Sequence, residues 1–318
     1  MTKTTSAAVC ATPERGSDDD GSSGMAVQEA LTDFAATMTT ALDYLLPQMD
    51  GPESKLFEAM RYSTLGPGKF LRPYIVCKSA EMFGVPAQQY LRAGAAVEMV
   101  HTYSLIHDDL PAMDDDDMRR GRPSCHIAFD EATAILVGDA LLTLSFEVLA
   151  GNDTHPDPQV RSDLVMALAA RSGGAGMVGG QMIDLESEHA EVDVELIARL
   201  ETMKTGALIS YSSAAGAILG QGGDDVIKTL ETFGFELGLA FQITDDLLDV
   251  EGDEDDVGKK VGKDAEAGKS TFVSALGIDG ARREARRVTD RALSRLDAFG
   301  QKADALRSVA DFILNRNN

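Results

Sequence analysis

The sequence lacks several features that mark particular classes of protein. It has no tryptophan, only three cysteines, and 29 lysines and arginines against 52 aspartates and glutamates, which gives a net charge of −23. Because nucleic-acid backbones are bound through an excess of Lys and Arg, this balance argues against nucleic acid as a partner. The cysteines are odd in number and far apart, so they form neither a disulfide framework nor a CxxC metal site. These absences favour a protein of the reducing cytoplasm.

Long apolar runs are also missing. No uncharged apolar segment reaches the ~18 residues of a membrane-spanning helix, and the best candidate, 209–219, is interrupted by serines and a glycine. We therefore expect a cytoplasmic protein without stable insertion into a membrane. Hydrophobic residues make up 44% of the 318 residues and charged residues 25%, which is typical of a globular chain. The length allows one large domain or two small ones.

The N-terminus differs in composition from the rest of the chain. Residues 1–24 are rich in Ser, Thr, Gly and Asp and contain almost nothing apolar. Such a segment cannot bury enough surface to offset the entropy of ordering it. It lacks the apolar core of a signal peptide and is too acidic for a transit peptide. We expect a disordered tail over 1–24 and a folded domain over 25–318, with Met25 as an alternative start or the end of a leader.

From Met25 onward, apolar residues recur with helical spacing. Leu31, Phe34, Met38 and Leu42 follow the i, i+3, i+7 pattern of an amphipathic helix. Similar Ala- and Leu-rich stretches span 89–109, 130–150, 158–171, 194–220, 226–250 and 280–314. Short linkers hold most of the prolines, and the alternation typical of strands is nearly absent. The pattern predicts an all-α single domain.

Two motifs resemble known binding loops but fail in detail. Residues 174–179 spell GxGxxG, but the helix-forming segment 164–170 precedes them instead of the strand that a dinucleotide fingerprint requires. Small residues that allow close helix packing or a wide cavity explain this motif better. Residues 253–258 begin like a calcium loop, but Val257 and Asp264 occupy its fifth and twelfth positions, where ligands are needed.

Two aspartate clusters carry the functional signal. The first, DDLPAMDDDD, spans 108–117 and is followed at once by MRRGRP; the second, QITDDLLD, spans 242–249. An acidic run is usually a solvated surface, but each cluster ends a strongly apolar helical stretch and is therefore expected to face inward. Adjacent carboxylates raise each other's pKa unless a cation neutralises them. We expect the clusters to bind cations.

The first cluster requires a bend in the chain. Pro111 cannot continue a helix without losing a hydrogen bond, and six residues at ~100° each put Asp114 about 240° from Asp108. We predict a kink or bulge after Asp109 that returns Asp114 to Asp108. His101 lies seven residues before Asp108 and therefore on the same helix face.

The second cluster forms a stripe. Gln242, Asp245 and Asp249 are spaced i, i+3, i+7 and share one helix face. All-oxygen ligands from two helices suit Mg²⁺ or Mn²⁺. Because Mg²⁺ bridges substrate phosphates, it would turn an acidic site into a receptor for anions, helped by nearby cations. The candidate cations are Lys69, Arg72, Arg119, Arg120, Lys204, Lys259, Lys263 and Lys269.

The segments DDLPAMDDDDMRRGRPSCH and FQITDDLLDVEGDEDDVGKKVGKD…GKST resemble the two aspartate-rich regions of the trans-isoprenyl (polyprenyl) diphosphate synthases, most closely the bacterial farnesyl diphosphate synthase branch. The likeness extends from about Met25 to Asn317. It implies a helical bundle around a deep cavity, usually a homodimer. It also implies Mg²⁺-dependent head-to-tail condensation of isopentenyl diphosphate with dimethylallyl or geranyl diphosphate, which gives farnesyl diphosphate.

The resemblance assigns roles to individual residues. Asp108, Asp114 and Asp245 would ligate Mg²⁺, and Asp109, Asp246 and Asp249 would support them. Arg119, Lys204 and Lys259 would hold the allylic diphosphate. Gly68, Lys69, Arg72, His101 and Arg120 would hold isopentenyl diphosphate. Thr205 and Gln242 would place oxygen dipoles near the developing carbocation, and Lys269 would close over the site.

Two positions need comment. The family often has Arg at position 70, where Phe70 cannot contact a phosphate. The resemblance also makes Tyr103 the floor of the product pocket, because an aromatic residue there, with two extra residues inside the first aspartate motif, marks the C15 product. Helix geometry alone puts Tyr103 about 140° from the Asp108 face. A core aromatic residue and, for His101, a hydrogen-bonded core histidine are the simpler interpretations from sequence.

Three alternatives remain open. A geranylgeranyl or geranyl diphosphate synthase shares every motif and differs in pocket depth. A terpene cyclase has a similar fold but needs no second diphosphate site. A non-catalytic divalent-cation-binding protein or partner subunit would keep the acidic residues without the basic phosphate ligands. No Ser-His-Asp or Cys-His arrangement is convincing, which agrees with a reaction that needs no nucleophilic side chain.

Overall fold

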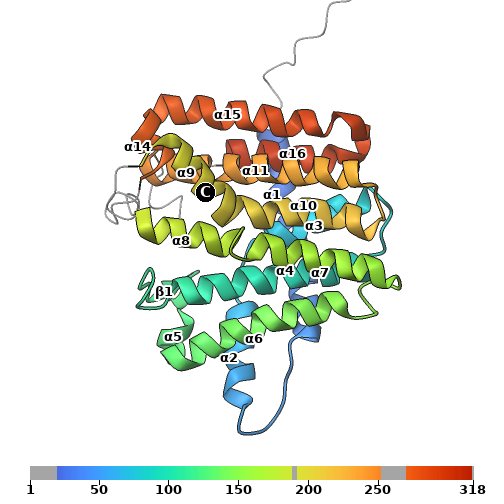
Figure 1. The fold of residues 1–318 in the computed structure, drawn as a ribbon, viewed down its shortest axis with the longest axis vertical. Coiled ribbons are helices and arrows are strands. Elements are labelled where there is room, and N and C mark those ends of the chain that lie inside the picture. The colour runs from blue at the N-terminus through green and yellow to red at the C-terminus, as the bar shows by residue number, and fades with distance from the viewer. Residues whose placement is uncertain (1–19, 188–191, 252–269, 317–318) are drawn as a thin grey trace, which may run out of the picture.

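The computed structural model describes residues 20–187, 192–251 and 270–316. These residues form a helical bundle with one very short hairpin (Figure 1). The helices are α1 (Asp20–Leu45), α2 (Ser54–Thr64), α3 (Leu71–Glu81), α4 (Ala87–Asp108), α5 (Cys125–Ala128), α6 (Glu131–Ala150), α7 (Pro158–Ser172), α8 (Met177–Ser187), α9 (Val194–Glu201), the π-helix η1 (Thr202–Gly206), α10 (Ala207–Leu219), α11 (Asp224–Glu251), α14 (Phe272–Leu276), α15 (Ile278–Arg295), the 3₁₀ helix η2 (Asp297–Ala303) and α16 (Asp304–Asn315). The all-α prediction is confirmed.

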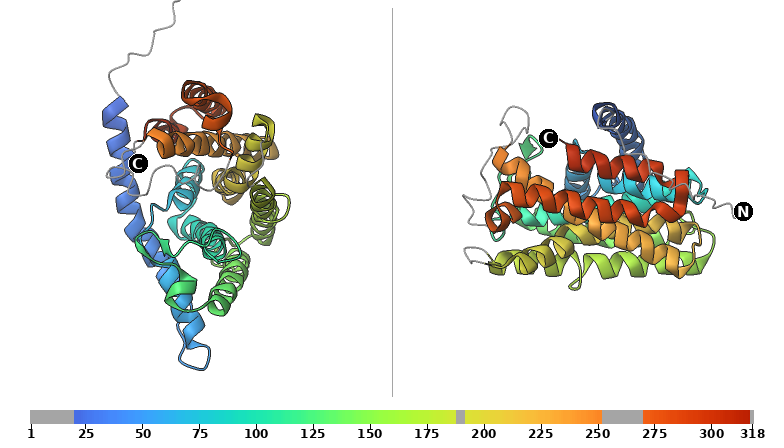
Figure 2. Two further views of the ribbon diagram at one scale, coloured as in Figure 1. Left: turned by 90° about the vertical axis from the view of Figure 1, so that its left-hand side faces the viewer. Right: turned by 90° about the horizontal axis from the view of Figure 1, so that it is seen from above.

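The helices pack in layers. In Figure 1, α15, α11, α10, α4 and α6 cross the view one below another, and α11 contacts both α15 and α10, while α4 contacts α6. Helix α3 packs against both α10 and α4. The long helix α1 runs along one side of the bundle, against α16, α3 and α4 (Figure 2). This arrangement puts the C-terminal ends of α4 and α11, which carry the two aspartate clusters, within one bundle.

Helix α10 is the centre of the bundle, and every one of its residues is buried. A helix that is apolar on all sides belongs inside a protein, and its small residues let neighbours approach closely. A Cβ atom on Gly216 would lie 2.2 Å from the backbone nitrogen of Ala80 in α3. On the other side, a Cβ atom on Gly234 of α11 would lie 2.5 Å from Cα of Ser210. Larger residues at these glycines would force α3 and α11 away from α10.

The boundaries differ from the sequence prediction in four places. Residues 20–24, assigned to the tail, form the first part of α1. The stretch 194–220 is divided by the π-helix η1, and 280–314 is divided by η2, in which Gly300 has φ 55°. Helices α2, α3 and α8 were not predicted; each has 11 residues, too few for a strong periodic signal.

The Arg-rich segment after the first aspartate cluster forms a hairpin that was not predicted. Strands β1 (Met118–Arg119) and β2 (Arg122–Pro123) pair antiparallel. Arg120 and Gly121 connect them with φ 52° and 75°, the positive values of a type I′ turn. Two-residue strands carry too little alternation to be read from a sequence. The hairpin therefore fixes the backbone positions of Arg119 and Arg120 and limits which groups their side chains can contact.

One helix among the described residues, α6, is long and apolar enough to cross a membrane by length and composition alone. Its apolar window is 44% buried, and α6 packs against α2, α4, α5 and α7. Core helices pass the same test, so this finding is weak evidence for a membrane span. At Gly138 the packing on α4 is close, because a Cβ atom there would lie 2.1 Å from Nε2 of His107.

Candidate functional site

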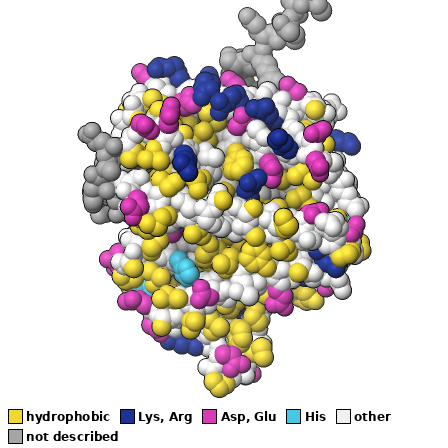
Figure 3. All heavy atoms as spheres, viewed as in Figure 1, with side chains coloured by type: hydrophobic (Ala, Val, Ile, Leu, Met, Phe, Trp, Pro, Cys, Tyr) yellow, Lys and Arg dark blue, Asp and Glu magenta, His cyan; other side chains and the backbone are white. Residues whose placement is uncertain are grey.

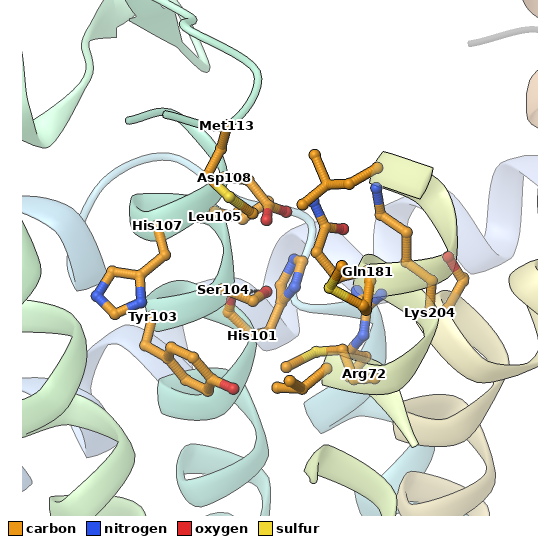
Figure 4. A pocket seen from close by; sticks show the side chains of 15 residues that line it. Arg72, His101, Tyr103, Ser104, Leu105, His107, Asp108, Met113, Gln181 and Lys204 are labelled. Atoms are coloured by element: carbon orange, nitrogen blue, oxygen red, sulfur yellow. Dashed lines mark hydrogen bonds between the residues drawn. The ribbon is translucent and has the colours of Figure 1, made fainter. Parts of the chain in front are cut away.

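A cavity of about 360 Å³ opens between α3, α4, α8 and η1 (Figure 4). Its walls are mainly apolar and include Leu105, Met113, Met177, Met182 and Leu185. Its polar lining residues are Arg72, His101, Tyr103, Ser104, His107, Asp108, Gln181, Lys204 and Thr205. The cavity therefore combines an apolar wall with a small set of charged groups, as expected of a site for an amphipathic ligand.

The first aspartate cluster turns back on itself, as predicted. Helix α4 ends at Asp108, and the backbone N–H of Asp114 donates to the carbonyl of Asp108 at 2.8 Å. The N–H of Asp115, which has φ 52°, donates to the carbonyl of Leu110 at 3.2 Å. These two bonds close the loop that contains Pro111. The carboxylates of Asp108 and Asp114 are thus brought close enough to interact.

Burial raises the pKa of Asp108 to about 6, and the negative charge of Asp114 adds to this rise, while Lys204 opposes it. A carboxylate held in an apolar cavity beside another carboxylate is destabilised in its charged form. A cation bound between them would relieve that cost. The electrostatics of this corner therefore favour a bound positive charge.

Asp109 has a different role from Asp108. It is buried and forms an ion pair with Arg119, whose Nε donates to Oδ1 of Asp109 at 2.9 Å. Arg119 also approaches Asp116 at 3.4 Å. Burial raises the pKa of Asp109, and the bond from Arg119 works against that rise. Asp109 thus holds the guanidinium of Arg119 in place on the hairpin.

The second aspartate cluster lies near the end of α11. Asp245 forms an ion pair with Arg316 at 2.5 Å, and the guanidinium of Arg316 stacks over the ring of Phe241 at 3.8 Å. Asp246 is buried and accepts a hydrogen bond from the backbone N–H of Phe272 at 2.8 Å. Because the first N–H groups of a helix have no partner within it, this bond anchors the start of α14. Asp246 therefore supports the fold around the cluster.

Lys204 and Thr205 enter the cavity from the π-helix η1. Single π turns often occur at functional sites, because the extra residue re-aims the side chains. Burial lowers the pKa of Lys204, but the ion pair with Asp184 of α8 and the charges of Asp108 and Asp114 together leave the pKa raised. The Thr205 hydroxyl donates to Oε1 of Gln242 at 3.2 Å. The structure thus brings Thr205 and Gln242 together, although 37 residues separate them.

The predicted basic patch is partly assembled around Gly68. A Cβ atom on Gly68 would lie 2.7 Å from Nη1 of Arg120, so the guanidinium of Arg120 lies directly against Gly68. Arg120 also donates to the carbonyl of Pro67 at 3.2 Å. Burial lowers the pKa of Arg72, with Arg120 contributing in the same direction and Glu98 opposing both. Arg72 and Arg120 are therefore electrostatic neighbours.

His101 lines the cavity, on the face of α4 that also carries Asp108. Burial lowers its pKa well below the usual value, and the charges of Arg72, Arg120 and Arg119 lower it further. A neutral imidazole beside these cations can donate one hydrogen bond without adding repulsion. Phe70, in contrast, is buried with φ 48° and contributes to the core.

Tyr103 is buried and also lines the cavity. Its ring meets the His107 ring edge-on at 5.7 Å (Figure 4 shows the two side by side). The helix wheel had turned Tyr103 away from the Asp108 face. The cavity, however, takes lining residues from more than one face of α4, Tyr103 and Asp108 among them.

Some predicted residues are not placed in the cavity. Lys69 and Arg120 are exposed, and neither lines it. Asp249 is partly buried near the end of α11. Lys259, Lys263 and Lys269, and the calcium-like segment 253–258, lie outside the described residues. Their predicted roles stay predictions.

Mg²⁺ or Mn²⁺ fits the donor set. Within the described residues, no three His, Cys, Asp or Glu side chains converge closely enough to form a metal cage by themselves. Mg²⁺ ordinarily takes one or two carboxylates and completes its shell with water and substrate phosphates. Asp108 and Asp114, whose charges repel, suit a metal that is shared with a substrate.

Sequence reasoning missed the whole of α8. This helix contributes Gln181 to the cavity and Asp184 to the ion pair with Lys204. The available signal was a polar pair spaced i, i+3 in an otherwise apolar, glycine-rich segment. The glycines do serve close packing, as expected: a Cβ atom on Gly180 would lie 2.3 Å from the backbone nitrogen of Lys204. The contact of Arg316 with Asp245 was also missed.

Comparison with known proteins gives a consistent result. The family model for polyprenyl synthetase matches residues 53–309. The farnesyl diphosphate synthase of Escherichia coli (strain K12) is 43% identical over 87% of this chain and 94% of that protein, and the one of Bacillus subtilis (strain 168) is 40% identical over 91% and 97%. The crystal structure of an FPP/GFPP synthase from Zymomonas mobilis superposes with a TM-score of 0.82 at 43% identity, covering 92% of this chain and 99% of that one. The cavity holds Asp108 together with the cations Arg72 and Lys204. Because the family model and these relatives also match most of the sequence, the chain belongs to the polyprenyl synthetase family.

Proposed function

We propose that the protein is a short-chain isoprenyl diphosphate synthase that condenses isopentenyl diphosphate with dimethylallyl and then geranyl diphosphate to give farnesyl diphosphate. The observation that carries this proposal is the composition of one cavity. A carboxylate with a raised pKa, Asp108, shares it with the cations Arg72 and Lys204 and with an apolar wall. The several bacterial relatives named farnesyl diphosphate synthase support the same activity.

The cavity suggests where each part of the allylic substrate binds. Its diphosphate would lie near Asp108 and Lys204, and its prenyl tail would extend along the apolar wall toward Tyr103. Mg²⁺ or Mn²⁺, held by Asp108, Asp114 and Asp245, would supply Lewis-acid stabilisation of the departing diphosphate. Lys204 would hold the same diphosphate, and Arg119, fixed by Asp109, would approach from the hairpin. We further expect Lys259 and Lys269 to bind the allylic diphosphate.

The second diphosphate would bind at the basic patch. Arg72 lines the cavity, and its Nε is buried with no hydrogen-bond partner in the described part of the chain. Such a donor is expected to find its acceptor on a ligand. Gly68 leaves room for Arg120, and neutral His101 can donate without adding charge. Together with Lys69, these residues would hold isopentenyl diphosphate.

The reaction then needs positioning and electrostatics in place of a nucleophilic side chain. The allylic C–O bond breaks, its electron pair leaves with the diphosphate, and the double bond of isopentenyl diphosphate attacks the cation. The oxygens of Thr205 and Gln242, which are hydrogen-bonded to each other, would orient their dipoles toward that cation. Loss of a proton to the released diphosphate restores the double bond. The apolar wall keeps water from capturing the cation.

The direct test is release of diphosphate from dimethylallyl plus isopentenyl diphosphate with Mg²⁺, followed by identification of the prenyl product. A synthase requires both substrates, whereas a terpene cyclase would release diphosphate from geranyl diphosphate or a longer allylic substrate alone. Excess chelator should abolish turnover. No reaction with both substrates and Mg²⁺ would contradict the proposal and favour a non-catalytic subunit.

We also propose a cytoplasmic homodimer, which is usual in the family. Figure 3 shows hydrophobic side chains gathered over the middle and lower part of one face. Helices α6, α7 and α8 carry exposed apolar residues, namely Ile135 and Leu136 on α6, Met166 on α7 and Met182 on α8. An apolar face of this kind often marks an interface. Analytical ultracentrifugation of the full chain should give twice the mass of 33.9 kDa; a monomer at micromolar concentration would contradict the dimer.

A further inference from the structure

Gln181 has an unusual position in the cavity wall. It belongs to α8 and lines the cavity, where Figure 4 draws it between Asp108 of α4 and Lys204 of η1. Its amide nitrogen Nε2 is buried and has no hydrogen-bond partner among the described residues. Neither the aspartate motifs nor the basic patch includes it. A buried polar group without a partner is rare and calls for an explanation.

No described neighbour accepts a hydrogen bond from Nε2 of Gln181, and this includes the Asp108 carboxylate that lines the same cavity. Met177, Met182 and Leu185 of α8 line the same cavity, and none of their side chains can accept a conventional hydrogen bond. Lys204, which lines the same cavity, has only donors and already pairs with Asp184. The acceptor is therefore expected to come from a molecule that enters the cavity.

The backbone keeps Gln181 at this position. The preceding residue, Gly180, packs so closely on η1 that a Cβ atom would lie 2.3 Å from the backbone nitrogen of Lys204. Gly179 also faces η1, since its Cβ atom would lie 2.8 Å from Cε of Met203. Helix α8 therefore packs directly on η1, and larger residues at these two glycines would force the two helices apart. This close packing keeps Gln181 of α8 and Lys204 of η1 in the wall of the same cavity.

We infer that the Gln181 amide donates a hydrogen bond to an oxygen of the allylic diphosphate and so completes the pocket for that group. This inference rests on the proposed function. The prenyl chain has no acceptor atoms, and the only oxygens of an allylic diphosphate belong to its ester and phosphate groups. Because negative charge on the diphosphate grows as the C–O bond breaks, the hydrogen bond becomes stronger in the transition state. Gln181 is thus expected to contribute to kcat as well as to binding.

The main test uses Gln181→Met, which keeps the length of the side chain and matches the neighbouring methionines but removes both amide groups. Calorimetry measures binding of geranyl thiolodiphosphate, which is not cleaved, and of inorganic pyrophosphate, each with Mg²⁺. Hydrogen bonds to charged groups imply a roughly ten- to hundredfold loss of affinity. We expect a similar loss for both ligands, because the contact is with the diphosphate. The KM for isopentenyl diphosphate should not change.

A second readout does not depend on catalysis. In the ligand-free protein the unpaired amide is destabilising, so Gln181→Met should leave the Tm unchanged or raise it by a few degrees. Met182→Leu is the matched control on the same wall and should leave pyrophosphate binding unchanged. Gln181→Glu keeps an acceptor oxygen but replaces the donor with a negative charge, and we expect it to weaken pyrophosphate binding further.

Three results would overturn the inference while leaving the proposed function intact. The first is normal binding of both ligands by an active Gln181→Met enzyme. The second is weaker binding of the prenyl ligand with normal pyrophosphate binding, which would assign Gln181 to the hydrocarbon. The third is normal or tighter pyrophosphate binding by Gln181→Glu, which would mean that the amide oxygen faces the ligand. A wild-type protein without turnover on both substrates would instead contradict the proposed function itself.

Discussion

Tyr103 is predicted to set the length of the product, and Tyr103→Ala tests this. The ring is 6% exposed and lies at the cavity wall against His107. Burial raises the pKa of Tyr103 to about 12, and the charge of Asp108 adds to the rise, so the phenol stays neutral at assay pH. Alanine would remove a ring larger than one isoprene unit from the wall. A close-packed interior cannot accommodate a longer chain while that ring remains.

The size of the effect follows from burial. Each buried CH₂ is worth ≈ 0.8 kcal/mol, so one extra five-carbon unit in the space left by the ring gains at most about 4 kcal/mol. That upper limit corresponds to a roughly thousandfold change in the ratio of C20 to C15 product, and an imperfect fit would reduce it, so we expect at least ~10-fold. The same truncation should cost stability of about 3 kcal/mol, at the low end for large aromatic residues because Tyr103 already borders a cavity.

The assay is chain-length chromatography of dephosphorylated products from labelled isopentenyl diphosphate and dimethylallyl diphosphate. Wild type should give mainly C15, Tyr103→Ala should shift toward C20, and the Mg²⁺ requirement should not change. Tyr103→Phe is the matched control, because it keeps the ring and should still stop at C15. A wild type that makes mainly C20, or a folded Tyr103→Ala that stops at C15, would refute the role of Tyr103.

Three further predictions concern charges. Asp108→Asn should reduce kcat roughly 10²–10³-fold without lowering the Tm, since it removes a destabilised buried charge; near-normal turnover would contradict the metal clamp. Arg72→Ala should raise the KM for isopentenyl diphosphate, and Lys204→Ala should raise the KM for the allylic substrate, each roughly ten- to hundredfold. If either variant affected both substrates equally, Arg72 and Lys204 would not serve separate diphosphates. Arg316→Gln should free Asp245 and tighten Mn²⁺ binding by roughly fivefold, a modest factor because Asp245 is partly exposed. Electron paramagnetic resonance without substrate measures this affinity, and an unchanged value would mean that Arg316 does not compete with the metal.

The sequence alone determined the features that depend on short spacing. Apolar periodicity predicted the long helices, because one face of an isolated helix must be apolar to be buried. Pro111 and the angle between Asp108 and Asp114 required the chain to turn back, and the backbone bond between the two residues shows that it does. Spacing likewise put Gln242 and Asp245 on one face of a helix that proved continuous.

Only the tertiary structure decided which charges meet and which groups stay unpaired. Asp109 holds Arg119 because the hairpin returns to the end of α4, and Asp184 holds Lys204 because α8 packs on η1. The cavity wall of α8 could not be predicted, since its position depends on Gly180 approaching the backbone of η1 to a distance that no other residue allows. Local sequence fixes the conformation of a segment, whereas the contacts between distant segments follow from how their surfaces fit.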